Sequence, residues 1–301
     1  MLNAKFIKEK ARELGADLVG IGDIAHYQKC DPQRDPKSIL PDATCVIGIG
    51  FRVPRALYRV MDDKNQFYNY TQLGVKTIDE ELSEIFLLRL GALIENEGYD
   101  ACLQRNVSNL RIKGDKTTNP ELIDTYELAL AEPVEPGKPA PDVILDFADS
   151  ARICGLGCVS CKGNVLTPEF GPFVRFVFIV TNAPLETDGP FAGNLCDNCG
   201  ECANACPGHA ITEKGLNSWQ CAVYYRGAHR SNPFMDETFL KDDPRREAII
   251  SGEYKFDAVS AREIYPELDF LPVCGSGYAP CICGKACDMA CFRHLKEKGL
   301  L

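Results

Sequence analysis

The chain has 301 residues, 45% of them hydrophobic and 25% charged, which are the proportions of a globular protein with enough apolar residues for a sizeable core. Its formal net charge of −10 argues against a nucleic-acid partner, because phosphate contacts need a basic surface, and it has no run of about 18 apolar residues to cross a membrane. Sixteen cysteines without a secretory signal favour a cytoplasmic, metal-binding protein over a disulfide-linked one.

Alternating helices and strands are predicted in the first half of the chain. Apolar residues at helical spacing predict a helix over residues 2–14, and the glycine that follows ends it. Short apolar runs predict strands at residues 16–22, 43–51 and 99–107. Residues 76–97 carry an apolar face with the period of an amphipathic helix.

The alternation continues up to a proline-rich connector and beyond it. We expect a helix at residues 120–131, whereas the connector at residues 132–141 holds too many prolines for a regular element. Residues 142–154 predict a further helix that Asp142 caps, and residues 173–180 predict another apolar strand. This order of elements indicates a layered α/β or α+β structure.

The sequence CDNCGECANACP, residues 196–207, is the strongest chemical signal in the chain. Its cysteine gaps of two, two and three residues, closed by proline, are typical of bacterial ferredoxins, in which thiolates hold a [4Fe–4S] cluster. The short gaps let one loop wrap three corners of the cube. In two-cluster ferredoxins the fourth cysteine, here Cys206, ligates the other cluster. The motif therefore predicts a second cluster elsewhere in the chain.

A second set of cysteines, CICGKAC at residues 281–287, supplies ligands for that cluster, with Cys221 as the remaining donor. We predict a crossed arrangement in which the first cluster takes Cys196, Cys199, Cys202 and Cys287, and the second takes Cys206, Cys221, Cys281 and Cys283. Because the gaps of the second set are irregular, Cys274 or Cys291 could replace one of these ligands. Two zinc sites would also use eight cysteines, but the closing Cys-Pro and the crossed pattern favour iron.

The segment before the cysteine motif, residues 154–186, carries a family resemblance. It has a Gly-Leu-Gly turn at residues 155–157, a Lys-Gly-Asn element at 162–164 and the sequence TPEFG at 167–171, followed by an apolar strand. In this order the elements resemble the segment that joins the corrinoid-binding core to the ferredoxin module in epoxyqueuosine reductases and reductive dehalogenases. The sequences LPDATCVIGIGF at residues 40–51 and SWQC before the last cysteines also resemble this family.

The resemblance implies an α+β fold, with a nitroreductase-like α/β core over residues 1–187 and a two-cluster, bacterial-ferredoxin-like domain over residues 188–301. It also implies cobalamin, a corrinoid that takes electrons from the two [4Fe–4S] clusters and passes them to a substrate, while a protein acid supplies the proton. The corrinoid-binding residues implied in this way are Gly155, Gly157, Lys162 and Asn164.

Candidates for catalysis come from the resemblance and from side-chain chemistry. The acidic residue that epoxyqueuosine reductases carry before the Gly-Leu-Gly turn falls on Pro141, so the adjacent Asp142 takes its place as candidate proton donor. Lys162 matches a basic position near the substrate in dehalogenases, and an exposed loop lysine is the alternative interpretation. Tyr126, like Tyr99, could donate a proton if an adjacent cation lowered its pKa.

Cys158 and Cys161 depart from the family pattern, and together with Cys154 they form a C-x3-C-x2-C sequence. Their spacing is also that of radical-SAM enzymes, but Ser160 stands where those enzymes have an aromatic residue, and the mid-chain position does not suit them. Two other interpretations of the three cysteines are a third metal site and a redox-active thiol group. The simplest interpretation is packing beside the glycine turn, since free cysteine behaves as a small hydrophobic residue.

From these features we expect a cytoplasmic reductase of the kind found in anaerobes. A ferredoxin or flavodoxin would supply electrons, and the corrinoid would reduce a small-molecule substrate; no membrane partner is expected. tRNA is not the expected substrate, because of the net charge of −10 and because the chain ends soon after its last cysteines. Two alternatives stay open. The first is an electron-transfer protein without a substrate of its own, which either binds no corrinoid or reactivates a corrinoid protein. The second is an enzyme that reduces epoxyqueuosine in tRNA.

Overall fold

A four-stranded antiparallel sheet forms the centre of the first part of the chain. The computed structural model describes residues 2–106, 111–113, 126–128, 133–275 and 277–301. In spatial order the strands are β1 (Leu18–Asp23), β2 (Cys45–Arg52), β8 (Val174–Thr181) and β3 (Ala101–Gln104), each antiparallel to its neighbour. All four strands lie where apolar runs predicted them. The strand that comes last in the sequence, β8, lies in the interior of the sheet between β2 and β3.

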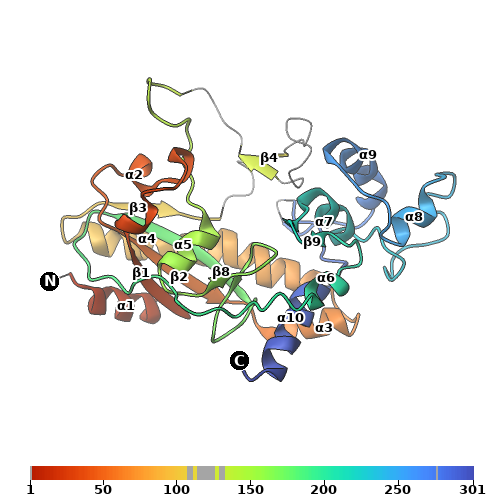
Figure 1. Ribbon diagram of the computed structural model, residues 1–301, viewed down its shortest axis with the longest axis horizontal. Coiled ribbons are helices and arrows are strands. Elements are labelled where there is room, and N and C mark those ends of the chain that lie inside the picture. The colour runs from red at the N-terminus through yellow and green to blue at the C-terminus, as the bar shows by residue number, and fades with distance from the viewer. Residues whose placement is uncertain (1, 107–110, 114–125, 129–132, 276) are drawn as a thin grey trace.

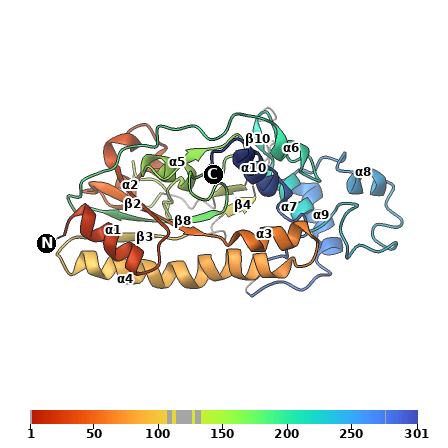
Figure 2. The same ribbon diagram turned by 90° about the horizontal axis from the view of Figure 1, so that it is seen from below.

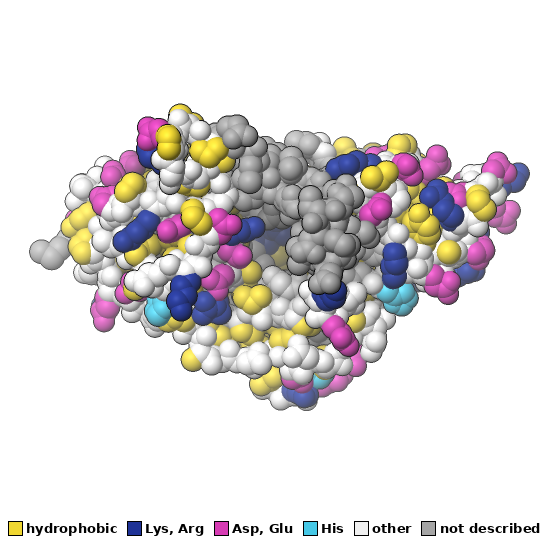
Figure 3. Space-filling view, turned by 45° about the horizontal axis from the view of Figure 1, so that its top comes forward, with side chains coloured by type: hydrophobic (Ala, Val, Ile, Leu, Met, Phe, Trp, Pro, Cys, Tyr) yellow, Lys and Arg dark blue, Asp and Glu magenta, His cyan; other side chains and the backbone are white. Residues whose placement is uncertain are grey.

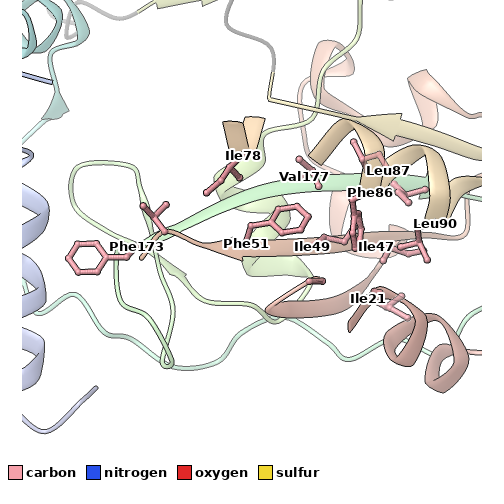
Figure 4. Close-up of a cluster of buried hydrophobic side chains, with 14 of the residues drawn as sticks. Ile21, Ile47, Ile49, Phe51, Ile78, Phe86, Leu87, Leu90, Phe173 and Val177 are labelled. Carbon is pink, nitrogen blue, oxygen red and sulfur yellow. The ribbon is translucent and has the colours of Figure 1, made fainter. Parts of the chain in front are cut away.

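Helices cover both faces of this sheet (Figures 1 and 2). Side chains that alternate along β2, such as Ile47, Ile49 and Phe51, pack with Phe86 and Leu90 of α4 on one face, as Figure 4 shows. The same face carries α1 (Ala4–Glu13), and α4 spans Ser83–Glu95. The opposite face packs against α5 (Phe147–Ile153).

Two glycines let α5 and the turn after it approach the sheet closely. Gly20 on β1 pairs with Gly48 on β2, and both face the Cys154 end of α5. A Cβ atom at Gly20 would lie 1.9 Å from the backbone oxygen of Cys154, so no other residue fits at this contact. The close approach fixes the position of the chain that leads to the cysteines.

The helix predicted over residues 76–97 is part of a longer helical stretch. It begins with π-helical turns, η3 (Tyr70–Lys76) and η4 (Ile78–Leu82), and continues directly as α4. In Figure 2 this stretch runs along one face of the molecule. It follows α3 (Arg55–Asp62), which packs against the C-terminal helix.

Two predicted helices differ from the structure. The helix predicted from Asp142 begins only at Phe147, because Asp146 is the residue whose carboxylate accepts hydrogen bonds from the first-turn amides of Ala148 and Asp149. Most of residues 120–131 lies outside the described residues. Within that range, β5 (Tyr126–Leu128) is a strand paired with β4 (Arg111–Lys113), and not helical.

Short elements complete the first part of the chain. They are η1 (Ile24–Tyr27), η2 (Pro32–Arg34), α2 (Pro36–Ile39) and the hairpin strands β6 (Cys158–Val159) and β7 (Val165–Leu166). The C-terminal part contains α6 (Glu201–Asn204), β9 (Ile211–Thr212), β10 (Gly215–Leu216), α7 (Ser218–Tyr225), α8 (Arg246–Ile250), α9 (Ala258–Leu268) and α10 (Ala286–Glu297). The fold is thus mixed α/β.

The C-terminal part has its own hydrophobic core and also shares that of the sheet. Trp219, Tyr224 and Phe256 form a buried cluster with side chains of α8 and α9. Met289 of α10 belongs to the core of the sheet, and Phe292 stacks on Phe173 with ring centroids 4.8 Å apart. Among the described residues, no helix combines the length and apolar character needed to span a bilayer.

Candidate metal centres

Five cysteine thiols line one small cavity between the ferredoxin-type loop, the β6–β7 turn and α10. The loop contributes Cys196, Cys199 and Cys202, the turn contributes Cys161, and the helix contributes Cys291. The loop can bend around the cavity because the glycine before α6 has a φ of +83°, a conformation that glycine adopts without strain. We call these five residues the first thiol group.

Four further cysteines, Cys206, Cys221, Cys283 and Cys287, form the second thiol group. Burial raises the pKa of Cys221 to about 12, and the neighbouring Cys283 and Cys206 thiols act in the same direction against a lowering contribution from Lys285. Cys287 has its pKa raised to about 12, chiefly by burial, with Cys283 again contributing. Thiols that disfavour each other's ionisation release their protons when a metal cation binds among them.

Helix α10 connects the two groups. Cys287 and Cys291 are four residues apart on this helix and therefore lie on the same face, one turn from each other. The helix packs against α6, which carries Cys202. One helix thus delivers a thiol to each group. The ligand sets differ from the prediction: Cys287 was assigned to the first cluster but lies with the second group, and Cys291, left open as an alternative, lies with the first.

Cys281, which was assigned to the second cluster, lies beside the second group but faces the core of the sheet. Its Sγ is 3.9 Å from the Sγ of Cys283, and its backbone N–H donates a 3.1 Å hydrogen bond to the hydroxyl of Thr71. The side chain is fully buried within the hydrophobic core. Cys274 pairs with Tyr278 in a short bridge near Lys76.

Two lysines and an aspartate surround the thiol of Cys287. The buried Lys162 forms an ion pair with the buried Asp288, and its Nζ also donates to the Sγ of Cys287 at 3.5 Å. Burial alone would lower the pKa of Lys162, but Asp288 and Cys287 together raise it above its ordinary value. Lys285 approaches the same carboxylate at 3.7 Å. No sequence pattern predicts this contact, because Lys162 and Asp288 are 126 residues apart.

A second charged set lies at the outer edge of the first thiol group. The Nε2 atom of His294 is 3.0 Å from a carboxylate oxygen of Asp197, and Lys298 donates to the same carboxylate at 2.6 Å. Hydrogen bonds from Lys298 and His294 hold the pKa of Asp197 below its usual range. These contacts attach the end of α10 to the ferredoxin-type loop.

The predicted catalytic residues Asp142 and Lys162 line different cavities. Asp142 is exposed and lines an open pocket of about 850 Å³, together with Lys37, Arg105 and the proline-rich connector. No cysteine is among the described residues that line this pocket. Lys162 lies elsewhere: it lines the cavity of the first thiol group, and its Nζ donates to the Sγ of Cys287 in the second. Tyr126 lies on β5, and its side chain is outside the described residues. Figure 3 shows a face of the molecule that is hollowed near its centre, with basic and acidic side chains interspersed around it.

The other residues assigned to corrinoid binding take part in internal contacts. A Cβ atom at Gly157 would lie 2.2 Å from the backbone oxygen of Leu166, and one at Gly155 would lie 2.9 Å from that of Gly189. Asn164 closes the β6–β7 turn, where its backbone oxygen accepts a 2.8 Å hydrogen bond from Ser160. These contacts shape the turn that carries Cys161 and Lys162 to the two thiol groups.

The three additional cysteines lie in three different environments. Cys154 is buried against the sheet, and its thiol donates to the backbone oxygen of Val46 at 3.3 Å. The Sγ of Cys158 accepts a 3.2 Å hydrogen bond from the amide of Leu195. Only Cys161 of the three lines the first thiol cavity. The structure therefore shows no common site for the three, and packing accounts for Cys154 and Cys158.

The donor chemistry of both thiol groups suits iron–sulfur clusters. Each group supplies at least four sulfur atoms from several directions, as a cube requires. Hydrogen bonds from a backbone amide and from Lys162 already point at sulfur atoms of Cys196 and Cys287. Such bonds are among the features that set the potential of a cluster.

Comparison with a family model supports this chemistry directly. Residues 193–212 match the 4Fe-4S binding domain, and this stretch holds the four cysteines of the ferredoxin-type motif. The match confirms the prediction of [4Fe–4S] binding in this segment and favours iron over zinc.

Comparison with known proteins extends the similarity beyond this segment. The chain is 35% identical over 241 residues to an epoxyqueuosine reductase of Bacillus subtilis (strain 168), covering 72% of this chain and 53% of that protein. It is 47% identical over 62 residues to the tetrachloroethene reductive dehalogenase of Sulfurospirillum multivorans, covering 20% and 12%. A solved structure of epoxyqueuosine reductase from Streptococcus thermophilus aligns with a TM-score of 0.47 and 16% identity, over 91% of this chain and 69% of that one. The chain thus spans about half the length of its Bacillus relative and less of the dehalogenase.

Proposed function

Because the chain belongs to the family of epoxyqueuosine reductases and reductive dehalogenases, we propose that it is an iron–sulfur oxidoreductase that reduces epoxyqueuosine in tRNA. The observation that carries this proposal is the match over 241 residues to the Bacillus epoxyqueuosine reductase. It favours the prediction of a tRNA substrate over the prediction of a small-molecule substrate. The expectation against tRNA rested on net charge and chain length, which are weaker arguments than this relationship.

We assign one [4Fe–4S] cluster to each thiol group. The proposed ligands are Cys196, Cys199, Cys202 and Cys291 in the first site and Cys206, Cys221, Cys283 and Cys287 in the second. When bound, these clusters supply single electrons to a reaction that removes the epoxide oxygen as water. The two sites share α10, which carries Cys287 of one and Cys291 of the other, so the protein holds them side by side. A ferredoxin or flavodoxin is the proposed electron donor.

The residues around Cys287 have an electrostatic role in this scheme. Lys162 and Lys285 bring two positive charges toward the second thiol group, and Asp288 compensates one of them. A net positive charge beside the thiolates favours the reduced, more negative form of a cluster. We therefore assign Lys162 to the second cluster and not to the substrate.

Membership of the family indicates a corrinoid cofactor in addition to the clusters. In such an enzyme the corrinoid supplies a strongly reducing cobalt centre. Among the residues predicted to bind it, Gly155, Gly157, Lys162 and Asn164 make the internal contacts described above, so we assign no corrinoid contact to them. We propose the nitroreductase-like core and the division at residues 187/188 on the resemblance alone. The cytoplasmic location is proposed from the cysteine content and the lack of a secretory signal in the sequence. Asp142 stays the proposed proton donor, and Tyr126 the alternative.

The proposal is tested with anaerobically purified protein supplied with iron, sulfide and hydroxocobalamin. With a chemical reductant and tRNA from a strain that accumulates epoxyqueuosine, we expect conversion to queuosine, measured by mass spectrometry of the nucleosides. A Cys206→Ala variant, which removes a proposed ligand of the second cluster, is the matched control and should not convert the tRNA. Protein with both clusters and corrinoid bound but without conversion would overturn the assignment of substrate.

Reductive dehalogenation is the second candidate, and the short, 47% identical match to a dehalogenase favours it. The same preparation is offered a chlorinated alkene in place of tRNA, and release of chloride is measured. Chloride release without conversion of tRNA supports this candidate. Failure of both reactions, together with absence of a corrinoid spectrum, supports an electron-transfer protein without a substrate of its own.

A further inference from the structure

The first thiol group contains one cysteine more than a [4Fe–4S] cube can use. Four of its members belong to the ferredoxin-type loop and to α10, where the cysteine spacing already accounts for them. The fifth, Cys161, comes from the β6–β7 turn, which belongs to the first part of the chain. The surplus thiol needs its own explanation.

Cys161 is in direct contact with the other thiols of the cavity. Its Sγ is 4.0 Å from the Sγ of Cys202, and its backbone N–H donates to the Sγ of Cys196 at 3.4 Å. Packing does not explain these contacts, because Cys161 is exposed whereas Cys154 and Cys158 are buried.

The turn that carries Cys161 is held in place on both sides. Before it, Cys158 accepts a hydrogen bond from Leu195, the residue that precedes the ferredoxin-type motif. After it, Lys162 forms the buried ion pair with Asp288 of α10. The contacts of Cys158 and Lys162 therefore hold Cys161 at the cavity. Asp288, the partner of Lys162, lies on α10, the helix that also carries Cys291.

We propose that Cys161 is an exchangeable fifth ligand of the first cluster, able to take the iron position of Cys291. This inference rests on the cluster proposed for the first thiol group. In the exchange, the Cys161 thiol loses its proton and forms a sulfur–iron bond, while the Cys291 sulfur–iron bond breaks and that sulfur takes up a proton. No electrons are gained or lost. The cube keeps four thiolate ligands throughout, and Cys291 on α10 is released from it.

The experiment compares Cys291→Ala, Cys161→Ala and the double variant by iron analysis and electron paramagnetic resonance of the anaerobic proteins. Cys291→Ala should keep two [4Fe–4S] clusters, because Cys161 replaces the missing ligand, and Cys161→Ala should also keep both. The double variant should lose one iron from the first cluster and show a [3Fe–4S] signal after mild oxidation. Cys102→Ala, on β3 and outside both thiol groups, is the control and should behave as the unmodified protein.

Alkylation provides a second measurement that does not depend on the double variant. In the unmodified, cluster-loaded protein Cys161 should react with iodoacetamide, whereas in Cys291→Ala it should be protected at least tenfold. A [3Fe–4S] signal in Cys291→Ala, or an unchanged reactivity of Cys161, would overturn the inference. Absence of any cluster in the unmodified protein would instead contradict the proposed function, so the two failures are distinguishable.

Discussion

Replacing Lys162 by methionine should lower the reduction potential of the second cluster more than that of the first, because its Nζ contacts Cys287 while its side chain only lines the first cavity. The Nζ atom of Lys162 donates to the sulfur of Cys287 at 3.5 Å in a buried environment. Methionine keeps most of the volume of the side chain and removes the positive charge. The reduced cluster then loses an attractive interaction with its additional electron.

The distance gives the size of the effect. A unit charge 3.5 Å from the sulfur interacts with an added electron by about 5 kcal/mol at an effective dielectric constant of about 20. For a one-electron couple this corresponds to roughly 200 mV. Because the added electron spreads over the cluster and lies farther away than the sulfur, we expect about half of this, a decrease on the order of 100 mV.

The assay is an anaerobic redox titration followed by electron paramagnetic resonance, in which the shifts of the two clusters are compared. Asp288→Asn is the matched control and should raise the potential of the same cluster, since it removes the compensating negative charge. The double variant should lie between the two single variants. Equal shifts of both clusters, or no shift of either in Lys162→Met protein that retains its full iron content, would refute the reasoning.

Three further predictions concern stability. Ile47→Ala, at a fully buried position of β2, should lower the free energy of unfolding by about 2 to 5 kcal/mol, whereas Leu88→Ala, at a position 64% exposed, should change it by less than about 0.5 kcal/mol in the same denaturant titration. Burial, and then the charge of Lys64, lower the pKa of His229 from 6.5 to about 4. The unfolded chain therefore binds a proton that the folded chain does not, and the free energy of unfolding decreases by up to about 3 kcal/mol as the pH falls from about 6.5 to 4. His229→Gln should remove this part of the pH profile of stability, and an unchanged profile would contradict the assignment. Removal of iron with a chelator should lower the thermal midpoint, because the clusters bind only the folded chain; an equal midpoint with and without iron would show that the thiol groups do not depend on metal.

The sheet could be predicted from the sequence because its strands are short apolar runs. The interior strand β2 is an apolar run in the sequence, as expected of a strand that is covered on both faces, and seven of its eight residues are buried. The first residue of α5 was harder to predict, because Asp142 and Asp146 are both acceptable N-caps. Only the packing of the helix against the sheet decides between them. Tertiary contact, not local preference, determined that boundary.

The ferredoxin-type motif placed four cysteines correctly on one loop, because their spacing is specific to the geometry of a cube. The second set was ambiguous, since the sequence offers Cys281, Cys283, Cys287 and Cys291 for fewer positions. The helix that begins at Ala286 places Cys287 and Cys291 on one face, an arrangement that cysteine spacing alone does not predict. The approach of Cys161 to this site depends on a hairpin and an ion pair between distant residues, which spacing cannot reveal.

The central claim is that two [4Fe–4S] clusters occupy the two thiol groups that α10 links. Mössbauer spectroscopy of anaerobic, iron-57-enriched protein tests it most directly when the unmodified chain is compared with Cys287→Ala. We expect two [4Fe–4S] clusters in the unmodified protein and, in the variant, an altered second cluster beside an unaltered first one. Spectra with a single cluster in the unmodified protein, or a variant in which the cluster bound by the loop of residues 196–202 changes instead, would contradict it.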